Sequence, residues 1–371
     1  MGKKILRATT VGMSLNIFCK ELLSELKEEG YEIVALSSPD SDLKELGERE
    51  GVRTIGVPME RRVNPWKDFI SLMKLIRVMR REKPDMVHSM TPKAGLLCMI
   101  ASWLVGVPVR LHTFTGLVWP TASGLSRRIL ILTDKITCAC ATHIIPEGEG
   151  VKRDLQRCIT KKPMKVLGYG NVRGVDLDYW KRNTKRNGHL LLTFIFVGRI
   201  VRDKGVNELV SAFVRLNQQF PDTRLLLVGP YEENLDPISP ETKQLIDTCE
   251  RIEAVGSQKD VCSFYEQSDV LVFPSYREGF PNVVIEAGAM DLPSIVTDIN
   301  GSREIIENGK NGLIVPPRDE QALYEAMKWM VEHPDARERM AMNARPMVAS
   351  RYEQGFVRQC LKDYYKKILS A

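Results

Sequence analysis

The chain has 371 residues, of which 43% are hydrophobic and 27% are charged, so it can form two ordinary domains with apolar cores. This composition excludes a disordered chain, a collagen-like fibre and a small disulfide-rich protein. The net charge of +6 hides an asymmetry, because residues 1–188 carry 32 basic against 20 acidic side chains, whereas residues 189–371 carry 21 against 27. A basic half followed by an acidic half indicates that the two halves meet different partners.

We expect neither a signal peptide nor a membrane span in this sequence. Arg7 interrupts the apolar run that begins at Ile5, and the longest uncharged stretch, 94–109, is shorter than a bilayer requires. The eight cysteines form no CxxC pair, and Cys138 and Cys140 lack further ligands at zinc spacing. These features predict reduced thiols, no metal site and a cytoplasmic location.

Strand-like and helix-like segments alternate over the first 170 residues. The expected strands are 4–9, 32–37, 53–57, 85–89, 109–113 and 143–146. The expected helices are 16–29, 43–50, 65–82, 94–104 and 126–140. This alternation is typical of a parallel sheet with helices on both faces.

A basic, glycine-containing stretch, 161–188, separates the two charge regimes, and the alternation restarts after it. The expected strands are then 190–197, 224–228, 252–255, 270–273, 294–297 and 312–315. The expected helices are 206–218, 240–251, 261–267, 281–289 and 320–332, followed by helical pattern over 336–368. We therefore predict an α/β protein of two Rossmann-like, doubly wound parallel-sheet domains facing across a cleft, with ligands at the carboxyl ends of the strands.

The strongest motif joins a buried strand to a helix between Ser275 and Ala287. Glu278 lies in the turn and Glu286 lies eight residues later, so the two carboxylates could contact different parts of one extended ligand. The turn between them should leave backbone N–H groups available to an acidic or hydroxylic ligand, because a proline begins the helix. The residues of that turn are Gly279, Phe280, Pro281 and Asn282. Two solvated glutamates are the alternative, and the flanking turn favours the ligand.

A second motif, Gly198 to Gly205, follows the first strand of the acidic half. Arg199 offers a bidentate fork and Lys204 a point charge at the carboxyl end of a strand, where a diphosphate would lie. A solvated basic turn is the alternative. The contrast with the acidic surroundings favours anion binding.

Three further features lie at expected strand ends in the basic half. Gly12 lets the backbone approach a ligand at the first strand–helix turn, but the GxGxxG and Walker A patterns are absent, which argues against a nicotinamide oxidoreductase. Segments 88–95 and 112–116 carry Lys93, His112 and Thr113, which could assist proton transfer or hold an anionic acceptor. Spacing alone favours the alternative, that each histidine is a hydrogen-bonded structural residue.

Together, these residues resemble group 4 of the retaining glycosyltransferases with the GT-B fold. The resemblance covers nearly the whole chain and is most specific in the second half. The segments that carry it there are 198–205, 274–281, 286–287, 298–304 and 309–316. Segments 88–95, 112–116 and 168–176 are similar to a bacterial subgroup that extends undecaprenyl-diphosphate-linked sugars for capsule, O-antigen or glycan assembly.

The resemblance implies an acceptor domain, 1–172, joined by the terminal helix 352–371, and a nucleotide-sugar domain, 173–351. Glu278 and the backbone after it would contact the donor sugar, and Glu286 would bind the ribose. Arg199 and Lys204 would neutralise the leaving diphosphate, so that no metal or other cofactor is needed. The remaining roles it implies are donor binding by Gly12 and Gly198, positioning of sugar or acceptor by His112, and acceptor binding by Lys93 and Thr113.

The implied reaction is the retaining transfer of a hexose or N-acetylhexosamine from a UDP-sugar to a lipid-diphosphate-linked saccharide. Fixed cations at the leaving diphosphate would lower the barrier. A nucleotide-sugar epimerase and a non-catalytic nucleotide-sugar-binding subunit remain alternatives.

A polyprenyl-diphosphate acceptor would place the protein at the cytoplasmic face of the inner membrane. The basic half suits an anionic leaflet, and helices 65–83 and 126–137 combine apolar with basic side chains. The alternative is that both apolar stripes simply cover the sheet. We expect no nucleic-acid partner, because no basic-aromatic module occurs and the second half is acidic.

Overall fold

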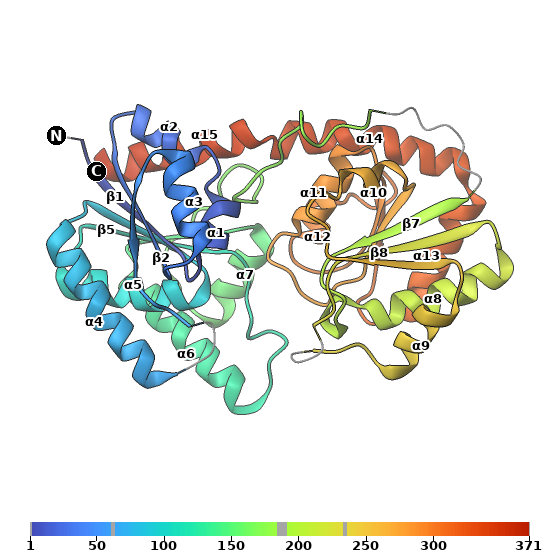
Figure 1. Cartoon of the computed structure of the whole chain (residues 1–371), viewed down its shortest axis with the longest axis horizontal. Helices are drawn as coiled ribbons and strands as arrows, with labels where there is room; N and C mark the ends of the chain where they lie inside the picture. Colours follow the sequence, from blue (N-terminus) through green and yellow to red (C-terminus); the bar gives the residue numbers. More distant parts are fainter. Residues whose placement is uncertain (1, 61–63, 184–190, 233–235, 371) are drawn as a thin grey trace. The chain divides into compact units, whose positions relative to one another are not determined.

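The computed structural model describes residues 2–60, 64–183, 191–232 and 236–370. The chain divides into two compact units, one formed by Met1–Arg173 with Gly355–Ala371 and the other by Gly174–Gln354 (Figure 1). Each unit is built around its own six-stranded, parallel sheet.

The sheet of the first unit has the order β3-β2-β1-β4-β5-β6. Its strands are β1 (Lys4–Ala8), β2 (Glu32–Ser37), β3 (Arg53–Gly56), β4 (Met86–Met90), β5 (Val109–Phe114) and β6 (His143–Pro146). Its helices are α1 (Gly12–Phe18), α2 (Leu22–Glu28), α3 (Ser41–Glu50), α4 (Pro65–Glu82), α5 (Pro92–Val105), α6 (Gly124–Cys140), α7 (Glu149–Cys158) and α15 (Gln354–Ser370).

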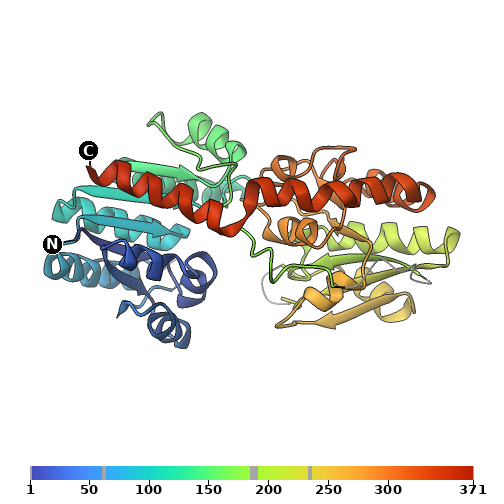
Figure 2. The same cartoon turned by 90° about the horizontal axis from the view of Figure 1, so that it is seen from above.

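Alternate residues of each strand enter two different apolar layers, because successive side chains of a strand point to opposite faces. Leu6 and Val87 pack with α4 and α5 on one face. Ile5 and Met86 pack with α1, α2 and α15 on the other, and α15 runs along that face in Figure 2. The strands are therefore buried on both sides, as in other doubly wound sheets.

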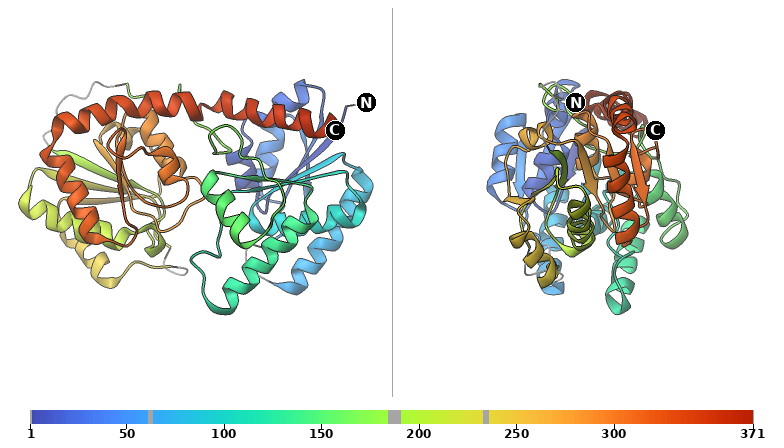
Figure 3. Two further views of the ribbon diagram at one scale, coloured as in Figure 1. Left: turned by 180° about the vertical axis from the view of Figure 1, so that it is seen from behind. Right: turned by 90° about the vertical axis from the view of Figure 1, so that its right-hand side faces the viewer.

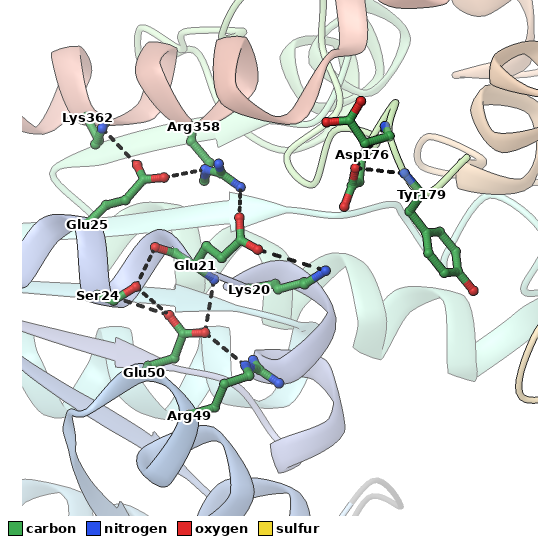
Figure 4. A network of polar contacts seen from close by, with 11 residues as sticks. Lys20, Glu21, Ser24, Glu25, Arg49, Glu50, Asp176, Tyr179, Arg358 and Lys362 are labelled. Carbon is green, nitrogen blue, oxygen red and sulfur yellow. Dashed lines mark hydrogen bonds and ion pairs between the residues drawn. The ribbon is translucent and has the colours of Figure 1, made fainter. Parts of the chain in front are cut away.

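Ion pairs fix α15 to α2 in addition to apolar packing. Arg358 pairs with Glu21 at 3.0 Å and with Glu25 at 2.8 Å, and Lys362 pairs with Glu25 at 2.8 Å (Figure 4). Because these charges form a shared network rather than isolated pairs, they hold the C-terminal helix in one register on the first unit.

The second unit repeats the topology of the first. Its sheet has the order β12-β11-β10-β7-β8-β9, so that both sheets follow the 3-2-1-4-5-6 pattern when each is numbered from its own first strand. The strands are β7 (Leu192–Val197), β8 (Thr223–Val228), β9 (Ile252–Gly256), β10 (Val270–Phe273), β11 (Ser294–Thr297) and β12 (Gly312–Val315).

Helices cover both faces of this second sheet. They are η1 (Arg202–Lys204), α8 (Val206–Gln219), α9 (Pro240–Thr248), α10 (Cys262–Glu266), α11 (Asn282–Ala289), α12 (Ser302–Ile305), α13 (Glu320–Glu332) and α14 (Pro334–Tyr352). Helices α8 and α13 pack together on one face, and α11 and α14 pack together on the other (Figure 3).

The predicted fold class is confirmed, but one expected helix is divided, and the helical pattern over 336–368 forms two helices. The segment 16–29 forms α1 and α2, because Glu21 adopts a left-handed φ of 63° and the Glu50 carboxylate accepts the backbone N–H groups of Glu21 and Ser24. The segment 336–368 is interrupted at Glu353, where Val175 takes the backbone hydrogen bonds of Tyr352 and Gln354.

Other expected and observed segments do not coincide. Helices α7 and α12 were not predicted, and Leu190 and the part of the connecting stretch at 184–188 lie outside the described residues. Among the described residues, no helix is both long enough and apolar enough to cross a bilayer. All eight cysteines are free thiols.

Candidate functional site

Two motifs from distant parts of the sequence meet at one edge of the second sheet. Strands β7 and β10 are hydrogen-bonded neighbours, and the order of the strands reverses between them. The loops that follow them, 198–205 and 274–281, leave the sheet at its carboxyl edge. Doubly wound sheets bind ligands at this switch point, so the topology alone identifies the loops as the candidate site.

Close contact between the two loops depends on Gly205. This residue has a φ of 71°, and a Cβ atom on it would lie 2.1 Å from the carbonyl oxygen of Pro274. The Tyr276 N–H donates to the carbonyl of Asp203 at 2.9 Å, and the Arg277 guanidinium pairs with the Asp203 carboxylate at 3.1 Å. The backbone and one ion pair therefore hold the two loops together.

Lys204 and Glu278 form an ion pair across these loops. Both side chains are mostly buried, at 16% and 17% exposure, and the Ser275 hydroxyl donates to the same Glu278 oxygen at 2.7 Å. The Lys204 ammonium also lies 5.2 Å from the centroid of the Phe273 ring. These contacts fix the cation and the carboxylate in place, as a preorganised polar site requires.

Arg199 lies at the same edge but is held differently. It is half exposed, and its guanidinium pairs with Glu232 at 2.5 Å. Gly198 precedes it, and Gly229 must remain glycine because a Cβ atom there would lie 1.8 Å from the Gly198 carbonyl oxygen. Both predicted cations thus have carboxylate partners, which an arriving diphosphate would have to displace or share.

The turn before α11 is supported from behind by another glycine. A Cβ atom on Gly301 would lie 2.6 Å from the Gly279 oxygen and 2.7 Å from Phe280 Cα, so only glycine allows this approach. Phe280 is buried against Tyr352, with ring centroids 5.5 Å apart. The turn, including Pro281 and Asn282, is therefore rigidly placed next to Glu278.

Glu286 is buried on α11, unlike the solvated helix-surface residue that was the alternative. Burial raises the pKa of the Cys262 thiol to about 11, and the charges of Asp260 and Glu286 add to this effect. The contact of Glu286 with a ribose stays a prediction.

The predicted site residues of the first unit have partners of their own. The Gly12 N–H donates to Asp40 at 2.9 Å, and a Cβ atom on Gly12 would lie 2.1 Å from that carboxylate. Lys93 is mostly buried and pairs with Asp68 at 2.7 Å. These contacts give a structural reason for both residues, while their roles toward donor and acceptor stay predictions.

Thr113 belongs to a buried polar cluster that the sequence did not reveal. Its hydroxyl lies 2.7 Å from Nε2 of His88, whose Nδ1 contacts both Arg7 and Tyr365. The Arg7 Nη1 donates to the Tyr365 hydroxyl at 2.8 Å. Burial and the charge of Arg7 hold the pKa of His88 well below its usual value, so the histidine is neutral. It is therefore placed to connect β1, β4, β5 and α15.

His112 lies at the end of β5, beside a hollow. Burial lowers the pKa of His112 to about 3, so its ring is neutral, and its Nδ1 lies 2.9 Å from the Ser89 hydroxyl. A Cβ atom on Gly95 would lie 2.3 Å from the imidazole, which shows how closely α5 approaches the ring. The hollow also contains Asp134 and Trp119. Neither of these stood out in the sequence, because they lie in an unremarkable helix and loop.

Within the described residues, no group of three or more His, Cys, Asp or Glu side chains is arranged to hold a metal ion. At the second sheet, Arg199, Lys204 and Arg277 are each paired with a carboxylate instead.

Comparisons with known proteins match both halves of the chain. The family described as "Glycosyl transferase 4-like domain" matches residues 15–170, and the one described as "Glycosyl transferases group 1" matches residues 182–347. The capsular polysaccharide biosynthesis glycosyltransferase CapM of Staphylococcus aureus is 31% identical over 99% of this chain and 98% of its own length.

A second relative and a solved structure extend this likeness. The UDP-Gal:alpha-D-GlcNAc-diphosphoundecaprenol alpha-1,3-galactosyltransferase of Escherichia coli is 28% identical over 75% of this chain and 74% of its own. Anabaena HepE in complex with UDP superposes with a TM-score of 0.80 over 99% of this chain and 100% of its own, at 17% identity. The structural likeness therefore supports the fold.

Proposed function

Because the chain belongs to group 1 of the glycosyl transferases, we propose that it moves a sugar from a UDP-sugar to a lipid-diphosphate-linked saccharide. The family comprises retaining, metal-independent hexosyltransferases. The similarity to CapM assigns the reaction to the assembly of a capsular or other surface polysaccharide. The transferred sugar would be a hexose or an N-acetylhexosamine.

The donor would bind to the second domain, for which we propose the limits 173–351. Lys204 is the single most informative residue, because it is fixed at the switch point of the sheet beside Glu278 and the rigid 279–282 turn. As the bond to the sugar breaks, negative charge collects on the diphosphate, and a cation already in place stabilises it without reorganisation. Arg199 would add a second, more mobile cation.

Glu278 would then bind the transferred sugar itself. Its Oε1 is held by Lys204 and Ser275, so its other oxygen can accept hydrogen bonds from sugar hydroxyls. Glu286 would bind the ribose, and uridine as the base is supported by the UDP in the HepE structure. The leaving phosphate would take the acceptor's proton, so no nucleophilic carboxylate is assigned.

The acceptor would bind to the first domain, residues 1–172 with 352–371. The name of the Escherichia coli relative, which acts on a sugar-diphosphoundecaprenol, supports a lipid-linked saccharide as the acceptor class. His112, Thr113 and Lys93 lie in this domain, and Gly12 lies at its first strand end.

We propose further that the first domain docks on an anionic membrane leaflet through α4. The residues of α4 that face the core are Ser71, Leu75, Ile76 and Met79. Four apolar residues at helical spacing lie exposed on the opposite side, namely Trp66, Phe69, Ile70 and Met73. The alternative that the apolar stripe of α4 only covers the sheet does not explain this second stripe. Exposed basic residues beside it, Lys67, Lys74 and Arg77, suit anionic lipid at about 1 kcal/mol each.

The donor site can be tested with Lys204→Met. We expect a loss of at least ~100-fold in kcat for UDP-sugar cleavage, with and without acceptor, because a fixed counter-charge is removed. Lys310→Met, which removes an exposed cation paired with Glu307 in the same unit, is the matched control. Equal rates in wild type and Lys204→Met would refute the assignment, and release of a 2-epimer would favour the epimerase instead.

The membrane contact can be tested by co-sedimentation with phosphatidylglycerol vesicles. Trp66→Ser with Phe69→Ser should weaken binding, whereas exchange of the exposed Met342 for serine, on α14, should not. Absence of wild-type binding at low salt would refute the proposal.

A further inference from the structure

A hollow at the carboxyl edge of the first sheet has the chemistry of a carbohydrate subsite. It is partly open to solvent. It lies between the ends of β4 and β5 and the helix α6, all within the first unit. Its polar lining includes His112, Thr115, Thr133 and Asp134, and its aromatic lining is Phe114 and Trp119. Small-molecule sites of proteins combine such apolar walls with a few convergent polar groups.

One of the polar groups lacks the hydrogen-bond partner that a buried donor normally has. The Trp119 side chain is 4% exposed, yet its indole N–H makes no hydrogen bond of normal geometry within the described residues. A buried, unpaired donor costs about 1–3 kcal/mol, so such a group in a native protein calls for an explanation. The Trp119 donor and the Asp134 carboxyl border the same hollow.

Asp134 is a carboxyl group without a cationic partner. Burial raises the pKa of Asp134 to about 7, and the indole N–H of Trp119, directed at the carboxyl, lowers it in part. No ion pair with Lys, Arg or His compensates its charge among the described residues. The Trp119 donor, the Asp134 carboxyl and the neutral His112, whose Nδ1 lies beside the Ser89 hydroxyl, therefore border one space, and the carboxyl meets no cation there among the described residues.

A ligand hydroxyl would complete this arrangement. A hydroxyl can accept from the indole N–H and donate to the carboxyl at the same time, and a second hydroxyl can reach Nε2 of His112. The position of His112 is fixed by Ser89 on one side and by the backbone at Gly95 on the other. A ring with adjacent hydroxyls and an apolar face matches both the polar and the aromatic lining.

We propose that this hollow binds the terminal sugar of the acceptor, and that Asp134 and Trp119 select that sugar through its hydroxyl groups. The inference rests on the proposed transferase function and deepens it, since it names the residues that read the acceptor. Asp134 is a binding and specificity residue here, and no proton transfer is assigned to it.

The test uses purified full-length protein and short-chain isoprenyl-diphosphate acceptors. Four of them carry glucose, galactose, N-acetylglucosamine or N-acetylgalactosamine, and the corresponding UDP-sugars serve as donors. The acceptor on which the wild type is most active is then used for all variants. If the wild type transfers to none of the four, the proposed function itself fails, independently of the hollow.

Asp134→Asn and Trp119→Phe should each raise the acceptor KM about tenfold and leave the donor KM within twofold. Both variants should also discriminate less strongly than the wild type among the four acceptors. Asp363→Asn, an exposed carboxyl on α15, is the matched control and should change neither constant. Circular dichroism melts check that each variant folds, and Trp119→Phe, which keeps an aromatic ring, carries the test if Asp134→Asn does not fold.

An unchanged acceptor KM in a folded Asp134→Asn or Trp119→Phe enzyme that still transfers sugar would overturn the inference while the proposed function stands. A rise in the donor KM instead of the acceptor KM would also overturn the inference, because the hollow would then bind the donor rather than the acceptor.

Discussion

Exchange of Asp134 for asparagine should stabilise the protein at pH 8 and leave its stability nearly unchanged at pH 4.5. Burial raises the pKa of this carboxyl to about 7 in the folded protein, whereas an aspartate in an unfolded chain titrates near ~3.9. Between these values the folded state holds a proton that the unfolded state has released. Stability therefore falls as the pH rises from about 4 to about 7 and is constant above that. Asparagine carries no charge, so the stability of the variant does not fall in this pH range for this reason.

The size of the effect follows from the same shift. A difference of roughly three pKa units at 1.36 kcal/mol each sets an upper bound of about 4 kcal/mol. The carboxyl borders an open hollow, so water relieves part of the cost, and we expect roughly 1–2 kcal/mol. For a domain of 150–250 residues this corresponds to a Tm increase of about 2–8 °C at pH 8.

Thermal melts of wild type and Asp134→Asn between pH 4.5 and 8.5 measure this directly, with Asp363→Asn as the control for a solvated carboxyl. His112, which lines the same hollow, stays neutral over the whole range because burial lowers its pKa to about 3. The Cys138 thiol, on which the charge of Asp134 acts, stays protonated because burial raises its pKa to about 12. A Tm difference that does not change with pH, or a variant less stable at pH 8, would refute the reasoning. Either result would mean that the carboxylate is well stabilised and needs no ligand.

Two further predictions concern the packing around each site. Gly205→Ala should abolish UDP-sugar cleavage, whereas Gly256→Ala should cost only stability: both residues have a φ of 71°, but a Cβ atom meets the Pro274 oxygen only at Gly205. Equal kinetics of the two variants would contradict the contact. Tyr365→Phe should lower the stability by about 1–3 kcal/mol, because it removes an acceptor from the fully buried Arg7 guanidinium, and an unchanged Tm would contradict the assigned hydrogen bond.

The sequence predicted most of the fold because its strands and helices are marked by local patterns. Helices such as α4 and α13 occupy the expected residues. The prediction of one helix over 16–29 was wrong for a physical reason: the apolar spacing continues across the break between α1 and α2. Glu50 caps α2 from α3, and Val175 intercepts the backbone before α15. Contacts from distant parts of the chain decide such breaks, so a local pattern cannot show them.

The candidate donor site was predictable to the same extent. Lys204 and Glu278 each stood out beside a glycine at the end of a strand, and strand order then brought them together. Their mutual ion pair could not be predicted, because it depends on how closely Gly205 approaches Pro274. Asp134 gave no signal, since a single aspartate in a helix is ordinary until its surroundings are known.

The two faces of α6 differ in their surroundings, which bears on the two interpretations that the sequence left open for this helix. Leu130, Thr133 and Asp134 share one face by their spacing of three and four residues, and this face lines the hollow. Leu125, Ile129 and Leu132 share another, and they are exposed at 72%, 43% and 57%. The only residues of α6 that are fully buried, Thr137 and Cys138, lie near its C-terminal end.

Few residues of α6 are fully buried, although Leu130 and Ile131 also touch the core, and most helical stability in proteins comes from a buried face. The exposed apolar residues of α6 and its hollow-lining polar residues are instead suited to the two parts of one amphiphilic acceptor. The apolar face would meet the lipid while Asp134 holds the sugar. Leu125→Ser with Leu132→Ser should therefore raise the KM for a long-chain acceptor and leave the KM for a two-isoprene acceptor unchanged. Equal changes for both chain lengths would contradict this division of roles.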